Sequence, residues 1–102
     1  MNKYEQAIME MISYGGEGRS FILNALKMME DKKYSEAEEE LNKARKTIDR
    51  GRLAHTQLLT LESEQETNFK VSLFLLHGAD YVSNAEDMYE FARSILNILR
   101  KI

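Results

Sequence analysis

Proline is absent from all 102 residues of this chain. It is the residue that most reliably ends or kinks a helix, because its ring clashes with the preceding turn and its nitrogen carries no hydrogen. The absence of proline is unusual for any fold rich in turns, and it favours long uninterrupted helices. We therefore look first for helical periodicity.

Apolar residues recur at steps of three and four from about residue 3 to 30, which is one face of a helix. They are Tyr4, Ile8, Met11, Ile12, Gly15, Ile22, Leu26 and Met29. Gly15, Gly16 and Gly18 interrupt this run, at about 1 kcal/mol each relative to alanine in a helix interior. Because the apolar phase continues on both sides, we predict one continuous helix. We expect it to be locally distorted at the glycines, the alternative being that these small residues let another helix approach closely.

A polar connection from Glu30 to Tyr34 precedes a second helical run. Ser35 and Glu38 have the spacing of a capping box, which satisfies free amides at a helix start. Glu39 and Lys43 are spaced to pair on its outer face. The apolar stripe is Ala37, Leu41, Ala44, Ile48, Gly51, His55, Leu58 and Leu59.

A polar stretch from Ser63 to Asn68 predicts a loop, and a third helix is expected from near Phe69 almost to the end. Its main stripe is Val71, Phe74, Leu75, Gly78, Val82, Ala85, Met88, Ala92, Ile95 and Leu99. Three long helices with short connections predict an all-α fold, an antiparallel three-helix bundle forming a single domain over residues 1–102.

The third helix also carries a second stripe, formed by Leu73, His77, Asp80, Asn84, Asp87 and Phe91. It is polar in the middle and apolar at both ends. A helix that needs partners on two sides indicates self-association. A monomer of three helices this long would also have a thin core, which favours the same conclusion.

Composition excludes several classes of protein. There is no cysteine, so disulfides and cysteine-based zinc sites are impossible. The net charge of −3 argues against nucleic-acid binding. No apolar run reaches the roughly 20 residues of a membrane span, and the first ten residues lack the apolar core of a signal peptide. We expect a cytoplasmic protein that does not insert into membranes.

His77 is the main candidate for chemistry, because an imidazole is poised near neutral pH. On the residues alone, a packed or solvated structural histidine is the commoner case. His77 and Asp80 have a spacing that suits two metal ligands, but one such pair is a weak signal. His55 reads more readily as a core histidine, and residues 15–18 lack the lysine and preceding strand of a phosphate-binding loop.

Four segments carry a family resemblance. They are Lys70 to Asp80 (KVSLFLLHGAD), Gly16 to Ser20 (GEGRS), Lys32 to Ala37 (KKYSEA) and His55 to Leu58 (HTQL). Their order and spacing resemble the lactose/cellobiose-type enzyme IIA family of the phosphoenolpyruvate-dependent sugar phosphotransferase system. The likeness covers nearly the whole chain, although Ala79 and Tyr81 stand where the family has glutamine and a second histidine.

The resemblance implies a phosphotransferase subunit that assembles as a trimer, a nine-helix bundle. His77 would accept phosphate from phospho-HPr and pass it to a cysteine of a IIB component, for uptake and phosphorylation of a β-linked disaccharide. Asp80 would gather at the threefold axis around a divalent cation, with Mg²⁺ the expected ion. The competing hypotheses are a helical adaptor or regulatory relative in which His77 is not phosphorylated, and a two-component histidine phosphotransfer domain.

The surroundings of His77 give further expectations. Gly78 beside it would let a partner backbone approach, and Leu73, Leu75 and Leu76 would divide between core and docking surface. Arg19, Tyr81 and His55 are candidate neighbours of the phosphoryl group, and the sequence does not rank them.

Overall fold

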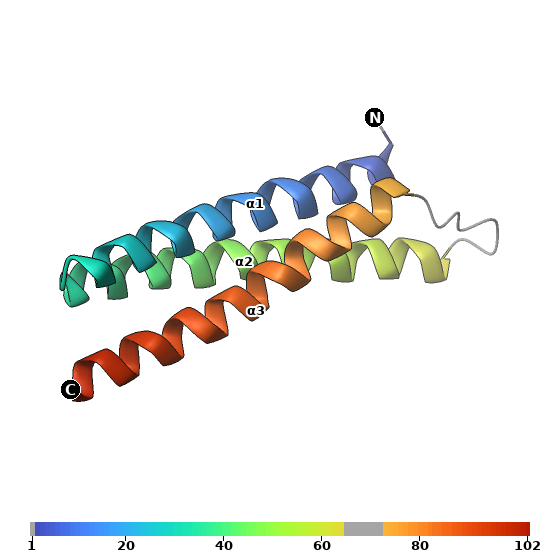
Figure 1. The fold of residues 1–102 in the computed structure, drawn as a ribbon. Coiled ribbons are helices and arrows are strands. Elements are labelled where there is room, and N and C mark those ends of the chain that lie inside the picture. The colour runs from blue at the N-terminus through green and yellow to red at the C-terminus, as the bar shows by residue number, and fades with distance from the viewer. Residues whose placement is uncertain (1, 65–72) are drawn as a thin grey trace.

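The computed structural model describes residues 2–64 and 73–102 and consists there of three long helices. They are α1 (Lys3–Glu30), α2 (Tyr34–Glu64) and α3 (Leu73–Lys101). Figure 1 shows α1 and α2 as an antiparallel hairpin, with α3 running in the direction of α1 across both. The bundle measures 55 × 21 × 19 Å. The predicted all-α three-helix bundle is confirmed.

Helix α1 runs without a break through its glycines. Two of these glycines lie where neighbouring helices pack closely against α1. A Cβ atom on Gly15 would lie 2.8 Å from the carbonyl carbon and Cβ of Tyr81 in α3. One on Gly18 would lie 2.7 Å from Cγ1 of Ile48 in α2. The two glycines therefore admit one neighbouring helix each, and close approach is the reason for them.

The core forms two clusters along the length of the bundle. The cluster nearer the α1–α2 connection contains Ile22, Met29, Leu41, Ile48 and Leu96, and the other contains Ile8, Met11, Leu58, Leu75 and Val82. Among the described residues, three predicted core positions are wrong: Phe74 is 38% exposed, Ile95 is 43% exposed while Leu96 is fully buried, and Leu59 is 52% exposed while Ala54 is buried. Over helices this long, the buried face drifts around the axis because 3.6 residues per turn matches no fixed repeat of three and four.

The start of α2 differs from the predicted capping box. The chain leaves α1 through Lys32, whose φ is 62°, and the amides of Lys32 and Lys33 donate to carbonyls of α1's last turn. Because α2 begins at Tyr34, Ser35 already lies inside the helix. Lys43 pairs with Glu40 at 3.3 Å and not with Glu39.

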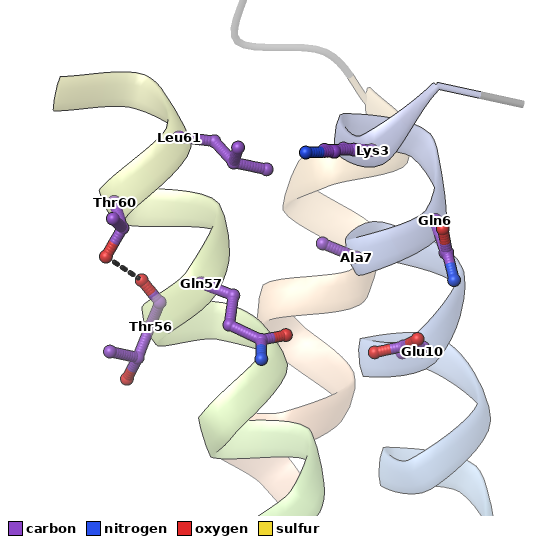
Figure 2. Close-up of a pocket in the computed structure, with 8 residues that line it drawn as sticks. All are labelled: Lys3, Gln6, Ala7, Glu10, Thr56, Gln57, Thr60 and Leu61. Carbon is purple, nitrogen blue, oxygen red and sulfur yellow. Dashed lines mark hydrogen bonds between the residues drawn. The ribbon is translucent and has the colours of Figure 1, made fainter. Parts of the chain in front are cut away.

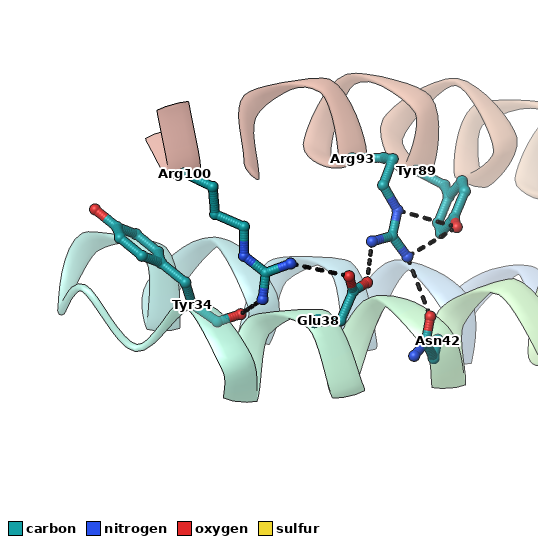
Figure 3. Close-up of polar contacts among 6 residues, drawn as sticks. All are labelled: Tyr34, Glu38, Asn42, Tyr89, Arg93 and Arg100. Carbon is teal, nitrogen blue, oxygen red and sulfur yellow. Dashed lines mark hydrogen bonds and ion pairs between the residues drawn. The ribbon is translucent and has the colours of Figure 1, made fainter. Parts of the chain in front are cut away.

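Glu38 has a different role, shown in Figure 3. Its carboxylate accepts from Arg93 and from Arg100, the latter at 3.1 Å. Arg93 also donates to Asn42 at 3.1 Å and to the hydroxyl of Tyr89. Two guanidinium groups attract a carboxylate more strongly than a backbone amide does. The predicted capping residue instead clamps the start of α2 to the second half of α3.

The predicted loop begins too early. Helix α2 continues through Ser63 and Glu64. The rest of the predicted loop, up to Asn68, and the predicted helix start near Phe69 lie outside the described residues.

Candidate functional site

His77 lies in the second turn of α3 with its side chain exposed. The next residue, Gly78, is buried, and a Cβ there would lie 3.4 Å from Ile8 and from Met11 of α1. Gly78 therefore admits α1 and is not open to a partner's backbone, which corrects the expectation from the sequence. Because Gly78 faces α1, the imidazole of the residue before it lies one position around the helix and is exposed.

Tyr81, one turn further along α3, contacts this imidazole. The two ring centroids are 4.4 Å apart and the planes are tilted by 50°. Such tilted aromatic pairs attract each other through their quadrupoles. The Tyr81 ring also borders α1, since a Cβ on Gly16 would lie 3.6 Å from its Cε2. The histidine thus has one ordered neighbour on its C-terminal side.

A hollow of about 300 Å³ adjoins this tyrosine between α1 and α3. The residues that line it are Gly15, Gly16, Arg19, Tyr81, Asn84 and Ala85. Of the three phosphoryl neighbours that the sequence left unranked, the hollow brings together Arg19 and Tyr81. His55 is half-buried on α2 and is not part of this lining.

Asp80 is exposed on α3, three residues after His77. Within residues 2–64 and 73–102 it forms no ion pair with a lysine or arginine, and no three metal-ligating side chains gather there. One described chain therefore does not close a metal site. Its exposed carboxylate is of the ligand type that Mg²⁺ prefers.

Apolar side chains surround the histidine. Leu73 is 86% and Leu76 49% exposed, whereas Leu75 is buried against α1 and α2. The expected division between core and surface is confirmed. The exposed leucines form an apolar surface beside the exposed imidazole, which is suitable for a protein partner.

The second stripe of α3 is exposed along its whole described length. Leu73, His77, Asp80, Asn84, Asp87 and Phe91 are all exposed, and Phe91 is 72% accessible. Ile98 and Ile102 continue the apolar part toward the C-terminal end. This pattern agrees with the prediction that α3 needs a partner on a second side.

A larger hollow of about 490 Å³ lies between the first turns of α1 and the last turns of α2, as Figure 2 shows. Lys3, Glu10, Gln57 and Leu61 are among its lining residues, and the Thr60 hydroxyl donates to the Thr56 carbonyl beside it. Neither His77 nor Tyr81 lines it. Its size alone assigns it no chemistry.

Sequence reasoning placed Asn84 on the second stripe of α3 but missed that it lines the hollow between α1 and α3, and it missed which helix packs against Tyr81. The signal was present in the glycine pair at Gly15 and Gly16. Adjacent glycines in a helix interior indicate that another element lies close, but the sequence does not say which element.

Within the described parts of the chain, none of the helices has the length and apolar character needed to cross a bilayer.

A family model described as "PTS system, Lactose/Cellobiose specific IIA subunit" matches residues 6–100. The lactose-specific EIIA component of Staphylococcus epidermidis is 26% identical, over 99% of this chain and 98% of that protein. The lichenan-specific phosphotransferase enzyme IIA component of Bacillus subtilis is 28% identical, over 96% of this chain and 88% of that protein.

Two solved structures have the same fold as this chain. The cellobiose-specific enzyme IIA from Bacillus anthracis superimposes with a TM-score of 0.88 at 30% identity, covering 99% of this chain and 92% of that one. The crystal structure of PtcA from S. mutans gives a TM-score of 0.89 at 26% identity, covering 98% and 99%.

Proposed function

This chain belongs to the lactose/cellobiose-specific IIA subunit family of the sugar phosphotransferase system, and we propose that it carries a phosphoryl group on His77. In this proposal it accepts the group from phospho-HPr in the cytoplasm and passes it to the IIB component. The single observation that carries the proposal is the exposed imidazole of His77 on a rigid helix, beside a buried glycine and an ordered aromatic ring.

The chemistry asks little of the protein beyond placement. Phosphoryl transfer needs an in-line nucleophile and stabilisation of the equatorial oxygens. An imidazole nitrogen of His77 forms a bond to phosphorus as the donor's nitrogen–phosphorus bond breaks, and the electron pair of that bond stays with the donor. A neutral imidazole is a competent acceptor because its ordinary pKa is about 6.5. The helix supplies the placement.

The partner surface is the apolar rim around the histidine. Leu73 and Leu76 are exposed within one turn of His77. Both HPr and the IIB component must reach the same imidazole, so we propose that they use this rim in turn. The names of the relatives, among them lichenan-, lactose- and cellobiose-specific components, support a β-linked disaccharide as the sugar of the system.

We also propose that the protein is a homotrimer in which one side of the second stripe of α3, formed by Asp80, Asp87 and Phe91, faces the threefold axis, while His77 stays open to its partners. In such an assembly each residue on the axis meets two copies of itself. Three Asp80 carboxylates brought together repel, and a divalent cation such as Mg²⁺ removes that conflict. The exposed, unpaired Asp80 supports this arrangement.

The decisive experiment is labelling with phosphoenolpyruvate, enzyme I and HPr, followed by intact mass measurement. The protein should gain the mass of one phosphoryl group (about 80 Da) in an acid-labile form, since the nucleophile is an imidazole nitrogen. His77→Gln should remain unlabelled, while His55→Gln, which removes the other histidine, should still accept the group. A His77→Gln variant that is labelled as fast as the natural protein would contradict the assignment.

A further inference from the structure

Hydrogen-bond donors gather on the hollow between α1 and α3. Arg19 comes from α1, and Asn84 and Tyr81, whose side chains carry an amide and a hydroxyl, come from α3. No carboxylate is among the residues that line the hollow. Arg19 forms no ion pair within the described chain. A guanidinium without a carboxylate partner, set beside a neutral amide and a phenol, is suited to an anion.

The backbone of α1 leaves room for Arg19 to turn toward α3. Helical side chains lean toward the N-terminus of their helix, so Arg19 covers the turn that contains Gly15 and Gly16. Neither glycine has a side chain to obstruct it. Tyr81 packs on that same turn, since a Cβ on Gly15 would lie 2.8 Å from the Tyr81 backbone.

Tyr81 connects this hollow to His77. One part of its side chain borders the hollow, and its ring centroid lies 4.4 Å from that of the imidazole. Arg19, the glycine turn and Tyr81 therefore line one hollow at the seam between α1 and α3, and the ring of Tyr81 also contacts the histidine. An anion attached to His77 would lie next to that ring.

Resting on the proposed function, we propose that this hollow is the anion subsite of the phosphohistidine. In it the Arg19 guanidinium, with the Asn84 amide beside it, holds the oxygens of the phosphoryl group on His77. When phosphate transfers, one bond forms from the imidazole nitrogen to phosphorus and one breaks at the donor. The three oxygens of the transferred phosphoryl group keep their negative charge. Arg19 stabilises that charge and so favours the phosphorylated form of the protein.

The test is an equilibrium measurement, because a residue that only docks the donor protein changes rates and leaves the equilibrium alone. The full-length protein and phospho-HPr are mixed without enzyme I, left to exchange the phosphoryl group, and analysed by intact mass. The variants are Arg19→Gln and Arg19→Lys. The matched control is Lys27→Gln, which removes an exposed cation two turns further along the same helix. Circular dichroism checks that each variant is folded.

We expect Arg19→Gln to shift the equilibrium constant toward phospho-HPr by about tenfold, which corresponds to a hydrogen bond to a charged group. Arg19→Lys should recover part of this loss, and Lys27→Gln should match the natural protein. If Arg19→Gln slows exchange but leaves the equilibrium unchanged, the arginine docks the partner and the proposal is wrong. If it changes neither, the proposal is also wrong. If the natural protein is never labelled, the proposed function itself fails.

Discussion

At the scale of single residues, Gly15 and Gly16 differ in what they face, although they are adjacent. A Cβ on Gly15 would lie 2.8 Å from the carbonyl carbon of Tyr81 and 3.0 Å from its carbonyl oxygen, so a whole helix would have to shift. A Cβ on Gly16 would lie 3.6 Å from the Tyr81 ring, an ordinary contact. Sequence alone makes the two glycines look alike, and only the position of α3 separates them.

This difference gives a prediction. Gly15→Ala should lower the free energy of unfolding by about 1–3 kcal/mol, the usual cost of overpacking. Gly16→Ala should be neutral or raise it by up to about 1 kcal/mol, because alanine has the higher helix propensity. Urea unfolding of the two variants at the same protein concentration compares them directly. Equal destabilisation by both substitutions would contradict the close approach of α3 at Gly15.

Tyr81 gives a second prediction at this scale. Removing its ring frees the His77 imidazole, so Tyr81→Ala should slow labelling by phospho-HPr by about ten- to a hundredfold, as expected when a reacting group is misplaced. Tyr81→Phe keeps the ring and should slow labelling much less. The measurement is the initial rate of phosphoryl gain by intact mass. Identical losses in the two variants would mean that the ring contact does not position the histidine.

At the scale of elements, the clamp at Glu38 joins α2 to α3. The hydrogen bond from Arg93, aided by that from Arg100, lowers the pKa of Glu38 below its ordinary value of 4.5. A carboxyl whose pKa is lowered by folding adds stability above its unfolded value and loses it as the pH falls through the folded one. The clamp should therefore act at neutral pH and weaken in acid, below about pH 4.5.

We therefore predict that Glu38→Gln lowers the free energy of unfolding by about 1 kcal/mol at neutral pH, a modest value because the groups are partly exposed. The difference from the natural protein should become smaller at an acid pH well below 4.5, as the carboxylate is progressively protonated. Glu39→Gln, at the exposed neighbouring position, serves as the control and should change little at either pH. A Glu38→Gln effect that is the same at both pH values would contradict the role of the charge.

At the scale of the whole molecule, the exposed stripe of α3 bears on the oligomeric state of the protein. We predict that light scattering gives a molar mass of about three times the monomer mass of 11.9 kDa. Phe91→Asp places a charge in the apolar part of the stripe and should shift the protein toward smaller species, because a buried unpaired charge is costly. Leu53→Asp, at an exposed leucine of α2, is the control. A natural protein that stays monomeric at all concentrations would reject the trimer.

The metal hypothesis belongs to the same scale, because one described chain holds no cluster of three ligating side chains. If three Asp80 carboxylates share a cation, EDTA should lower the melting temperature of the natural protein. Asp80→Asn removes the repelling charges and should make the melting temperature insensitive to EDTA. An unchanged melting temperature in EDTA, together with no metal in elemental analysis, would refute the axial site.

Much of the fold could be predicted from the sequence, because helical periodicity and the absence of proline are local properties. The bounds of α1, the three-helix bundle and the exposed second stripe of α3 all follow from spacing along the chain. The prominence of His77 also came from the sequence, through its motif. These features need no knowledge of which residues meet across the bundle.

Only the tertiary structure decided which distant residues meet. It placed Gly78 against α1, paired Glu38 with Arg93 and Arg100, and brought Arg19 and Tyr81 to the same hollow. It also chose Leu96 over Ile95 for the core. The physical reason is that these outcomes depend on the rotation and crossing angle of one helix against another. Packing of side chains across the seams sets those quantities, and a periodic pattern within one helix does not contain them.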